Sequence, residues 1–189
     1  MELIIWKRRG VFINSWESFD KYAEEYDAWY EKYKPAYESE LFALKTFLPE
    51  NPEKLKSLEI GVGTGRFASA LGIGLGLEPS RPMERIAKKR GIETVLGVAE
   101  FLPFKNQQFD LILIVTALAF LKNPIQALWE ALRALKPGGQ IVAGILDRDS
   151  PQGTLHRIRK QKRQVLFGCA FSFSSGGIKI PGRNWVRKD

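Results

Sequence analysis

Three glycines follow a short apolar stretch in the first half of the chain, in the run Glu59-Ile60-Gly61-Val62-Gly63-Thr64-Gly65. Glycines where a strand enters a helix let the backbone approach a ligand closely, and the first N–H groups of the helix stay free to bind it. A dinucleotide-binding loop has the spacing Gly-x-Gly-x-x-Gly, whose last position here is Arg66. Because a bulky arginine fits poorly where helix–strand packing needs glycine, a nicotinamide or flavin cofactor is disfavoured. A tight turn without a ligand is the alternative.

A second chemical group, Glu78, ends the next apolar stretch, Ile73 to Leu77. A carboxylate at the end of a parallel strand can accept hydrogen bonds from both hydroxyls of a ribose, as in nucleoside-binding Rossmann folds. The simpler interpretation is a surface acid at a strand end. The glycine run upstream favours the ribose interpretation.

These groups require a parallel sheet to position them, and the hydrophobic pattern predicts one. Strands are expected at 55–60, 73–77, 94–96, 109–116 and 140–146. Helices are expected at 66–71, at 81–90 and from Asn123 to Pro137, with Ser80 and Asn123 as N-caps. Strands that alternate with helices in this way indicate an α/β fold with right-handed crossovers. The side chains that the last helix should bury are Ile125, Leu128, Leu132 and Leu135.

An aromatic helix is predicted ahead of the sheet. Its aromatic residues recur mostly at spacings of three and four: Trp16, Phe19, Tyr22, Tyr26, Trp29, Tyr30 and Tyr33. Lys34-Pro35 should end or kink this helix, and a second amphipathic helix should run to Pro49. Such a stripe usually packs in a core, but aromatic rings can also stabilise a sulfonium through cation–π contacts.

Five runs together resemble a known family: LEIGVGTGRFA (58–68), GLEPS (76–80), AEFLPF (99–104), FDLILIVTALAFLKNP (109–124) and ALRALKPGGQIV (131–142). In this order they are similar to the motifs of class I S-adenosylmethionine-dependent methyltransferases, in particular the small-molecule, quinone-biosynthesis-type branch (methyltransferase type 11). The resemblance covers roughly Trp16 to Asp149. It implies a Rossmann-like, doubly wound, mostly parallel sheet with helices on both faces, an N-terminal helical lid, and S-adenosylmethionine as the cofactor.

The resemblance also implies which residues form the site. The methionine end of the cofactor would be held by Glu59, Gly61, Gly63 and Gly65, and the ribose by Glu78 next to Pro79. Ala99 and Glu100 would border the adenine, and Val115 and Thr116 would face the methyl sulfonium. The lid residues expected to line cofactor and substrate are Tyr22, Tyr26 and Tyr30. No catalytic base can be named, and methyl transfer from a sulfonium depends mainly on proximity and alignment.

The chain departs from the family's pattern in several places. Val98 stands where the family usually carries an acid that binds the adenine amine, and Ala119 and Phe120 stand where many relatives carry histidines. The segment between Gly65 and Glu78 predicts a helix short by about one turn. The tail gives no convincing strand pair, so the C-terminal hairpin strands are expected to be missing or altered. That would leave 140–146 at an exposed edge, which favours a homodimer.

The resemblance implies a division of the chain into an N-terminal extension (1–14), a helical lid (15–50) and a cofactor-binding core (51–150), and composition marks a basic tail (151–189). The net charge is +8, but Thr154 to Asp189 hold nine Lys/Arg and one Asp/Glu, which leaves 20 of each sign elsewhere. Nucleic acid is therefore expected as a partner only through the tail. The abrupt loss of the family's pattern after about Ser150 also fits a frameshifted end of the gene.

The remaining composition excludes several classes. Cys169 is the only cysteine and His156 the only histidine, so an internal disulfide is excluded and a metal site is disfavoured. No apolar run reaches the ~18 residues of a membrane span, and the start lacks the order of a secretory signal, so a cytoplasmic protein without a membrane partner is expected. Three functions stay open: a methyltransferase acting on a small molecule, a cofactor-binding but inactive, C-terminally incomplete homologue, and an RNA-associated methyltransferase that uses the tail.

Overall fold

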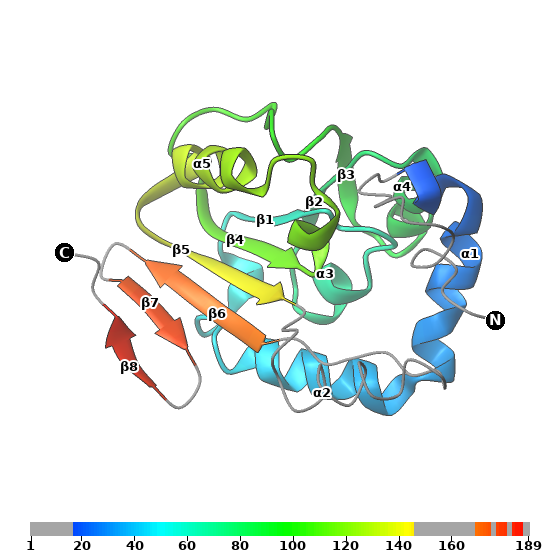
Figure 1. Cartoon of the computed structure of the whole chain (residues 1–189), viewed down its shortest axis with the longest axis horizontal. Helices are drawn as coiled ribbons and strands as arrows, with labels where there is room; N and C mark the ends of the chain where they lie inside the picture. Colours follow the sequence, from blue (N-terminus) through cyan, green and yellow to red (C-terminus); the bar gives the residue numbers. More distant parts are fainter. Residues whose placement is uncertain (1–16, 146–168, 175–176, 181–182, 187–189) are drawn as a thin grey trace.

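A single eight-stranded sheet organises the chain, with the strand order β3-β2-β1-β4-β5-β6-β7-β8 (Figure 1). The computed structural model describes residues 17–145, 169–174, 177–180 and 183–186. The strands are β1 (Ser57–Ile60), β2 (Leu75–Glu78), β3 (Glu93–Leu96), β4 (Phe109–Val115), β5 (Leu135–Ile145), β6 (Cys169–Ser174), β7 (Gly177–Ile180) and β8 (Arg183–Val186). The helices are α1 (Glu17–Lys32), α2 (Lys34–Lys45), α3 (Arg66–Ala70), α4 (Arg81–Lys89) and α5 (Pro124–Ala134), with the 3-10 turns η2 (Pro52–Lys54) and η3 (Ala117–Phe120).

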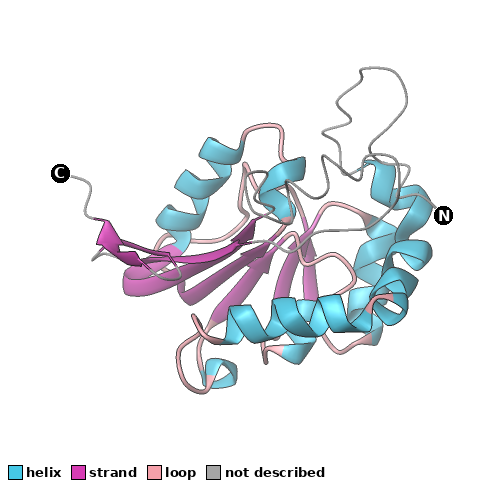
Figure 2. Ribbon diagram, turned by 60° about the horizontal axis from the view of Figure 1, so that its bottom comes forward, coloured by secondary structure: helices cyan, strands magenta, loops and turns pink. Residues whose placement is uncertain are grey.

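Strands β1 to β5 pair in parallel and carry helices on both faces, as Figure 2 shows, so the predicted fold class is confirmed. The alternation along β4 assigns each side chain to a face. Leu111, Leu113 and Val115 pack in the hydrophobic cluster that contains Leu44 of α2. Ile112 and Ile114 pack in the opposite cluster, with the alanines of α5. Because both faces are covered, nearly every residue of β4 is buried.

The residues that the sequence predicts at the ends of the helices are found there in the structure. Ser80 caps α4 by accepting a hydrogen bond from the Met83 N–H (3.4 Å), and Asn123 caps α5 through the Gln126 N–H (3.1 Å), as predicted. The short α3, five residues long, follows from the short segment between Gly65 and β2. Lys34, followed by a proline, begins α2 directly after α1 ends.

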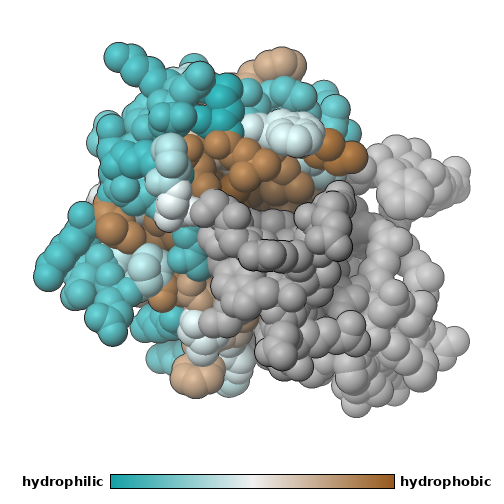
Figure 3. Space-filling view, turned by 90° about the vertical axis from the view of Figure 1, so that its left-hand side faces the viewer, coloured by the Kyte–Doolittle hydropathy of each residue, from teal (hydrophilic) through white to brown (hydrophobic). Residues whose placement is uncertain are grey.

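The predicted buried face of α5 is wrong at Ile125 and Leu132, whereas the predicted Leu128 and Leu135 do pack, partly buried, against the hydrophobic cluster. The helix packs on the sheet through Ala127, Ala131 and Ala134, each 0% exposed, because small side chains let its backbone approach the strands closely. Ile125 (69% exposed) and Leu132 (48% exposed) instead face outward beside Trp129. Figure 3, which faces the end of the molecule where α5 lies, shows hydrophobic surface gathered there. The helix also ends at Ala134 rather than at the predicted Pro137, which lies within β5.

The expectation for the C-terminal strands needs correction. The tail does form strands: β6 pairs antiparallel with β5 along Gln140–Ile145, and β7 and β8 follow as an antiparallel meander. The edge of β5 is therefore covered, contrary to the expected exposed edge that motivated the homodimer. The sequence signal was missed because these strands are short and interrupted by Gly and Pro. The predicted extension 1–14 and the histidine His156 lie outside the described residues.

Candidate active site

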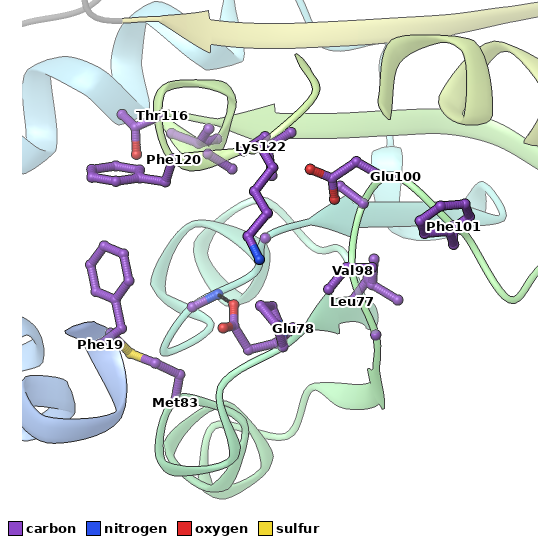
Figure 4. A pocket seen from close by; sticks show the side chains of 18 of the residues that line it. Phe19, Leu77, Glu78, Met83, Val98, Glu100, Phe101, Thr116, Phe120 and Lys122 are labelled. Atoms are coloured by element: carbon purple, nitrogen blue, oxygen red, sulfur yellow. Dashed lines mark hydrogen bonds between the residues drawn. The ribbon is translucent and has the colours of Figure 1, made fainter. Parts of the chain in front are cut away.

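A cavity of about 380 Å³ opens where β1, β2 and β4 end (Figure 4). Its walls come from the turns after these strands and from the helices beside them. The sheet side contributes Gly61, Gly63, Leu77, Glu78, Pro79, Gly97, Val98, Ala99, Glu100, Phe101, Val115, Thr116 and Ala117. The remaining lining residues are Phe19, Tyr26, Met83, Phe120, Leu121, Lys122, Asn123 and Gln126.

The glycine run forms the floor of this cavity at the end of β1. Gly61 and Gly63 have φ values of 72° and 55°, a conformation that side chains rarely adopt. A Cβ atom on Gly61 would lie 2.6 Å from the Cβ of Ala117, so this glycine also lets the turn after β4 pack against the loop. The loop is therefore shaped for close approach of a ligand to its backbone.

Glu78 fastens this loop from the neighbouring strand. One carboxylate oxygen accepts a hydrogen bond from the Gly63 N–H (2.8 Å) and the other from the Ser80 N–H (2.9 Å). The side chain is 5% exposed, and burial raises the pKa of Glu78 to about 7, although the two backbone bonds act in the opposite direction. A carboxylate has further lone pairs, so Glu78 can still accept hydrogen bonds from a ligand's hydroxyl groups.

Glu59, two residues before Gly61, is 1% exposed, and among the described groups its Oε2 atom has no hydrogen-bond partner. Burial raises the pKa of Glu59 well above its usual value, while the Ala68 backbone opposes the shift. A buried polar atom without a partner is costly in a folded protein. The unpartnered oxygen therefore fits a carboxyl group that a bound donor completes.

Arg66, the residue that breaks the dinucleotide spacing, holds the lid. Its guanidinium binds both carboxylate oxygens of Asp27 (2.8 and 3.0 Å) and one of Glu31 (2.6 Å) in α1. Arg90 binds the same Asp27 (2.6 Å) and the carbonyl oxygen of Thr64 in the glycine loop (2.6 Å). Burial acts to raise the pKa of Asp27, but the bonds from Arg66 and Arg90 outweigh it and hold that pKa well below its usual value. We call these four side chains and the Thr64 carbonyl the lid clasp.

The aromatic residues of α1 divide between pocket and core. The Tyr26 ring lines the cavity, and its hydroxyl oxygen lies 2.6 Å from that of Tyr30, which is buried behind it (6% exposed). Tyr22, where the helix has non-helical φ and ψ, is not among the lining residues. Burial raises the pKa of Tyr26 to about 12.

Most of the other predicted site residues line the cavity, and two do not. Pro79, Ala99, Glu100, Val115 and Thr116 all line the cavity, whereas Glu59 and Gly65 lie outside its lining. Sequence reasoning missed the lining residues Phe19, Met83, Phe120, Lys122 and Gln126. Phe19 belonged to the predicted aromatic stripe, but nothing in the sequence placed it at the ligand. Lys122, which extends toward Glu78 in Figure 4, carried no signal at all.

Comparison with known proteins agrees with this geometry. Residues 58–143 match the family model described as a methyltransferase domain. An uncharacterized protein of Methanocaldococcus jannaschii is 49% identical over 153 residues, which cover 81% of this chain and 73% of the relative. The crystal structure of a Thermotoga maritima "SAM-dependent methyltransferase, possible histamine N-methyltransferase" is 45% identical with a TM-score of 0.72, over 78% of this chain and 70% of the other. The demethylmenaquinone methyltransferase of Lactiplantibacillus plantarum is 35% identical over 100 residues, 45% of this chain and 42% of the relative.

The chain thus belongs to the S-adenosylmethionine-dependent methyltransferases, the family predicted from its motifs. The residues present fit S-adenosylmethionine as the cofactor. The unpartnered Oε2 of Glu59 lies in the strand that leads into the glycine loop, and a Cβ on Gly63 would meet only Tyr26, at 3.9 Å, so the loop backbone is open to a ligand. Among the described residues, no cluster of three His, Cys, Asp or Glu side chains could hold a metal ion.

Proposed function

We propose that this chain transfers a methyl group from S-adenosylmethionine to a small molecule bound in the cavity at the ends of β1, β2 and β4. One observation carries the proposal. The Glu78 carboxylate and the glycine loop that it fastens share a single cavity with an aromatic wall contributed by the lid helix α1. A cofactor and a second, less polar molecule can therefore lie next to each other.

When bound, S-adenosylmethionine supplies a methyl group on a positively charged sulfur. The chain's own residues then have three tasks. Glu78 and the backbone of Gly63 hold the ribose end, and the glycine loop holds the methionine end, with Glu59 buried behind it outside the cavity lining. Phe19 and Tyr26 of α1 cover the cavity and exclude water. Alignment of donor and acceptor in a site without water accounts for most of the acceleration that this reaction needs.

The size of the cavity supports a small acceptor. A volume of about 380 Å³ is at the lower end of small-molecule sites, which measure about 300–1,000 Å³. The Thermotoga maritima protein is named a possible histamine N-methyltransferase, and the Lactiplantibacillus plantarum relative a demethylmenaquinone methyltransferase. Histamine is therefore a reasonable first compound in an acceptor screen.

Calorimetric titration of S-adenosylmethionine into the full-length protein, repeated with Glu78→Ala, tests the proposal. We expect the dissociation constant to rise about tenfold or more in the variant, the effect of one lost charge-assisted contact. Transfer of a labelled methyl group to small acceptors should follow. A folded wild-type protein that does not bind the cofactor would contradict the proposal.

Two alternatives have distinct outcomes. Cofactor binding without transfer to any acceptor favours the inactive homologue. RNA binding that weakens steeply with salt and disappears when 154–189 are removed favours the RNA-associated enzyme. Of that tail the structure describes residues 169–174, 177–180 and 183–186. Among the described helices, none is long and apolar enough to cross a membrane. The cytoplasmic location and the homodimer stay predictions.

A further inference from the structure

Thr116, the residue that follows β4, has an unusual backbone conformation. Its φ of 56° and ψ of −13° lie in the left-handed region, which β-branched residues seldom adopt. The described part of the chain has two other non-glycine residues with positive φ, Asn51 and Gln107. Asparagine tolerates this region, and neither of the two lines the cavity. Thr116 alone of the three combines backbone strain with a place in the cavity wall.

The surrounding structure holds Thr116 in this conformation. Its N–H donates a 2.7 Å hydrogen bond to the Gly144 carbonyl oxygen of β5. The next residue, Ala117, packs so closely on Gly61 that a Cβ there would lie 2.6 Å away. The turn therefore cannot relax without moving the glycine loop. Persistent strain of this kind is concentrated at functional sites, where the structure around a residue fixes it.

The Thr116 hydroxyl is free to bind a ligand. It makes no capping bond to η3, and the described residues give it no other hydrogen-bond partner. Figure 4 shows Thr116 on the side of the cavity where Phe19 and Phe120 lie, away from Glu100 and Phe101. Glu78 and the glycine loop hold the cofactor, so this side is left for the acceptor.

Two aromatic rings give this side its chemical character. Phe19 and Phe120 meet edge to face with centroids 5.1 Å apart, and Phe19 meets Tyr26 in the same way at 5.5 Å. Aromatic faces stabilise a cation in a site without water. The two described hydroxyls here belong to Thr116 and to Tyr26, whose pKa burial raises to about 12, so neither takes a proton from an acceptor. Of the two carboxylates that line the cavity, Glu78 is assigned to the ribose and Glu100 lies on the other side (Figure 4). An alcohol would need such a base, whereas a neutral amine would not.

We propose that the Thr116 hydroxyl orients a neutral amine with an apolar body, and that Phe19 and Phe120 stabilise the ammonium formed from it. This inference rests on the proposed methyl transfer. The nitrogen lone pair forms the new N–C bond while the S–C bond breaks and its electron pair stays on sulfur. The positive charge thereby moves from sulfur to nitrogen. The amine gives up its extra proton to water before it enters the site, and the product leaves as the ammonium.

Labelled methyl transfer to three amines (phenethylamine, N-methylbenzylamine and histamine) is compared with transfer to 2-phenylethanol and benzyl alcohol. We expect transfer to amines only. Thr116→Val keeps the shape and removes the hydroxyl, so kcat/KM should fall about tenfold, the effect of about one lost hydrogen bond. Thr116→Ser keeps the hydroxyl and should retain most of the activity. The S-adenosylhomocysteine dissociation constant should stay within about twofold in both variants, because this residue is assigned to the acceptor.

A binding measurement tests the aromatic wall without turnover. Choline and its neutral isostere 3,3-dimethylbutan-1-ol are titrated into the S-adenosylhomocysteine-loaded protein. Choline should bind about threefold tighter or more, and Phe120→Leu should abolish that preference.

Four results would overturn the inference while leaving cofactor binding intact. They are transfer to alcohols and not to amines, no transfer to any of the three amines, a Thr116→Val variant as active as wild type, and equal binding of the two isosteres. A Thr116→Val variant that loses S-adenosylhomocysteine instead would place the residue in the cofactor site and also overturn it. A folded wild type that binds no cofactor defeats the proposed function itself.

Discussion

Asp27 is the residue on which the lid clasp converges, and Asp27→Asn should loosen it. The Asp27 carboxylate accepts three hydrogen bonds, two from Arg66 and one from Arg90, and its side chain is only 18% exposed. Breaking a fully buried ion pair costs about 3–5 kcal/mol. Here Arg66 keeps Glu31, Arg90 keeps the Thr64 carbonyl, and asparagine keeps one acceptor. We therefore expect a loss of about 2 kcal/mol in the free energy of unfolding.

For a chain of 189 residues this loss corresponds to a fall in Tm of about 4–8 °C, measured by calorimetry at pH 7. Glu38→Gln is the matched control, because Glu38 pairs with Lys34 at 3.8 Å in the open, with side chains 59% and 67% exposed. Its Tm should change by less than about 2 °C. Equal shifts in the two variants would refute the assignment of the clasp.

The same variant should change the response to acid. Arg66 and Arg90 lower the pKa of Asp27 in the folded state against the opposing effect of burial, so the carboxylate stabilises the fold fully above about pH 4 and loses this effect as the pH falls further. Thermal unfolding between pH 5 and pH 2 should therefore show a shallower loss of stability in Asp27→Asn than in wild type. Parallel curves would contradict this.

Three further variants of cavity residues test the site, with Gln107→Gly as a control outside the cavity. Gly61→Ala puts a Cβ 2.6 Å from the Cβ of Ala117 at a φ of 72°. The free energy of unfolding should therefore fall by about 2–4 kcal/mol, and cofactor binding should weaken in calorimetry. Normal stability and binding would contradict the close packing. Burial raises the pKa of Glu78 to about 7, so the ligand-free wild type should lose stability as the pH rises from about 4.5 to 7. In Glu78→Gln, thermal unfolding should show a smaller loss of stability over this pH range. An unchanged loss would exclude Glu78 as its source. Thr116→Gly and Gln107→Gly should each raise the free energy of unfolding by about 0.5–1 kcal/mol, because glycine relieves a positive φ. Only Thr116→Gly should slow methyl transfer. Equal transfer rates in the two variants would show that the strained residue Thr116 has no part in function.

The parts of the fold that could be predicted depend on signals that are local in the sequence. The run from Phe109 to Val115 is apolar on both faces apart from Asp110 and has the length of a buried strand. Ser80 and Asn123 carry their capping groups at the expected spacing. The glycine run and Glu78 were found because a strand followed by glycines, and then an acid at the end of the next strand, is a pattern with a physical cause. These elements place most of the predicted cofactor residues around one cavity.

The missed features depend on contacts between distant segments. On α5 the leucines outweighed the alanines in the hydrophobic pattern, but Ala127 and Ala131 decide which face can approach the sheet. The positive φ of Thr116 follows from the packing of Ala117 on Gly61 and from the bond to Gly144, neither of which is visible in the local sequence. Arg66 was judged only as a poor substitute for glycine, because its partner Asp27 lies 39 positions earlier.

That separation along the chain also bears on the order of folding. The helix α1 is made before the residues that fix it, since Asp27 binds Arg66, 39 positions later in the chain, and Arg90, 63 positions later. Contacts across such distances form late, after the loops between them have closed. The amide hydrogens of α1 should accordingly exchange through partial opening, while those of β4 exchange only when the whole sheet unfolds. In this protein a helix that is synthesised before the sheet thus completes its structure after it.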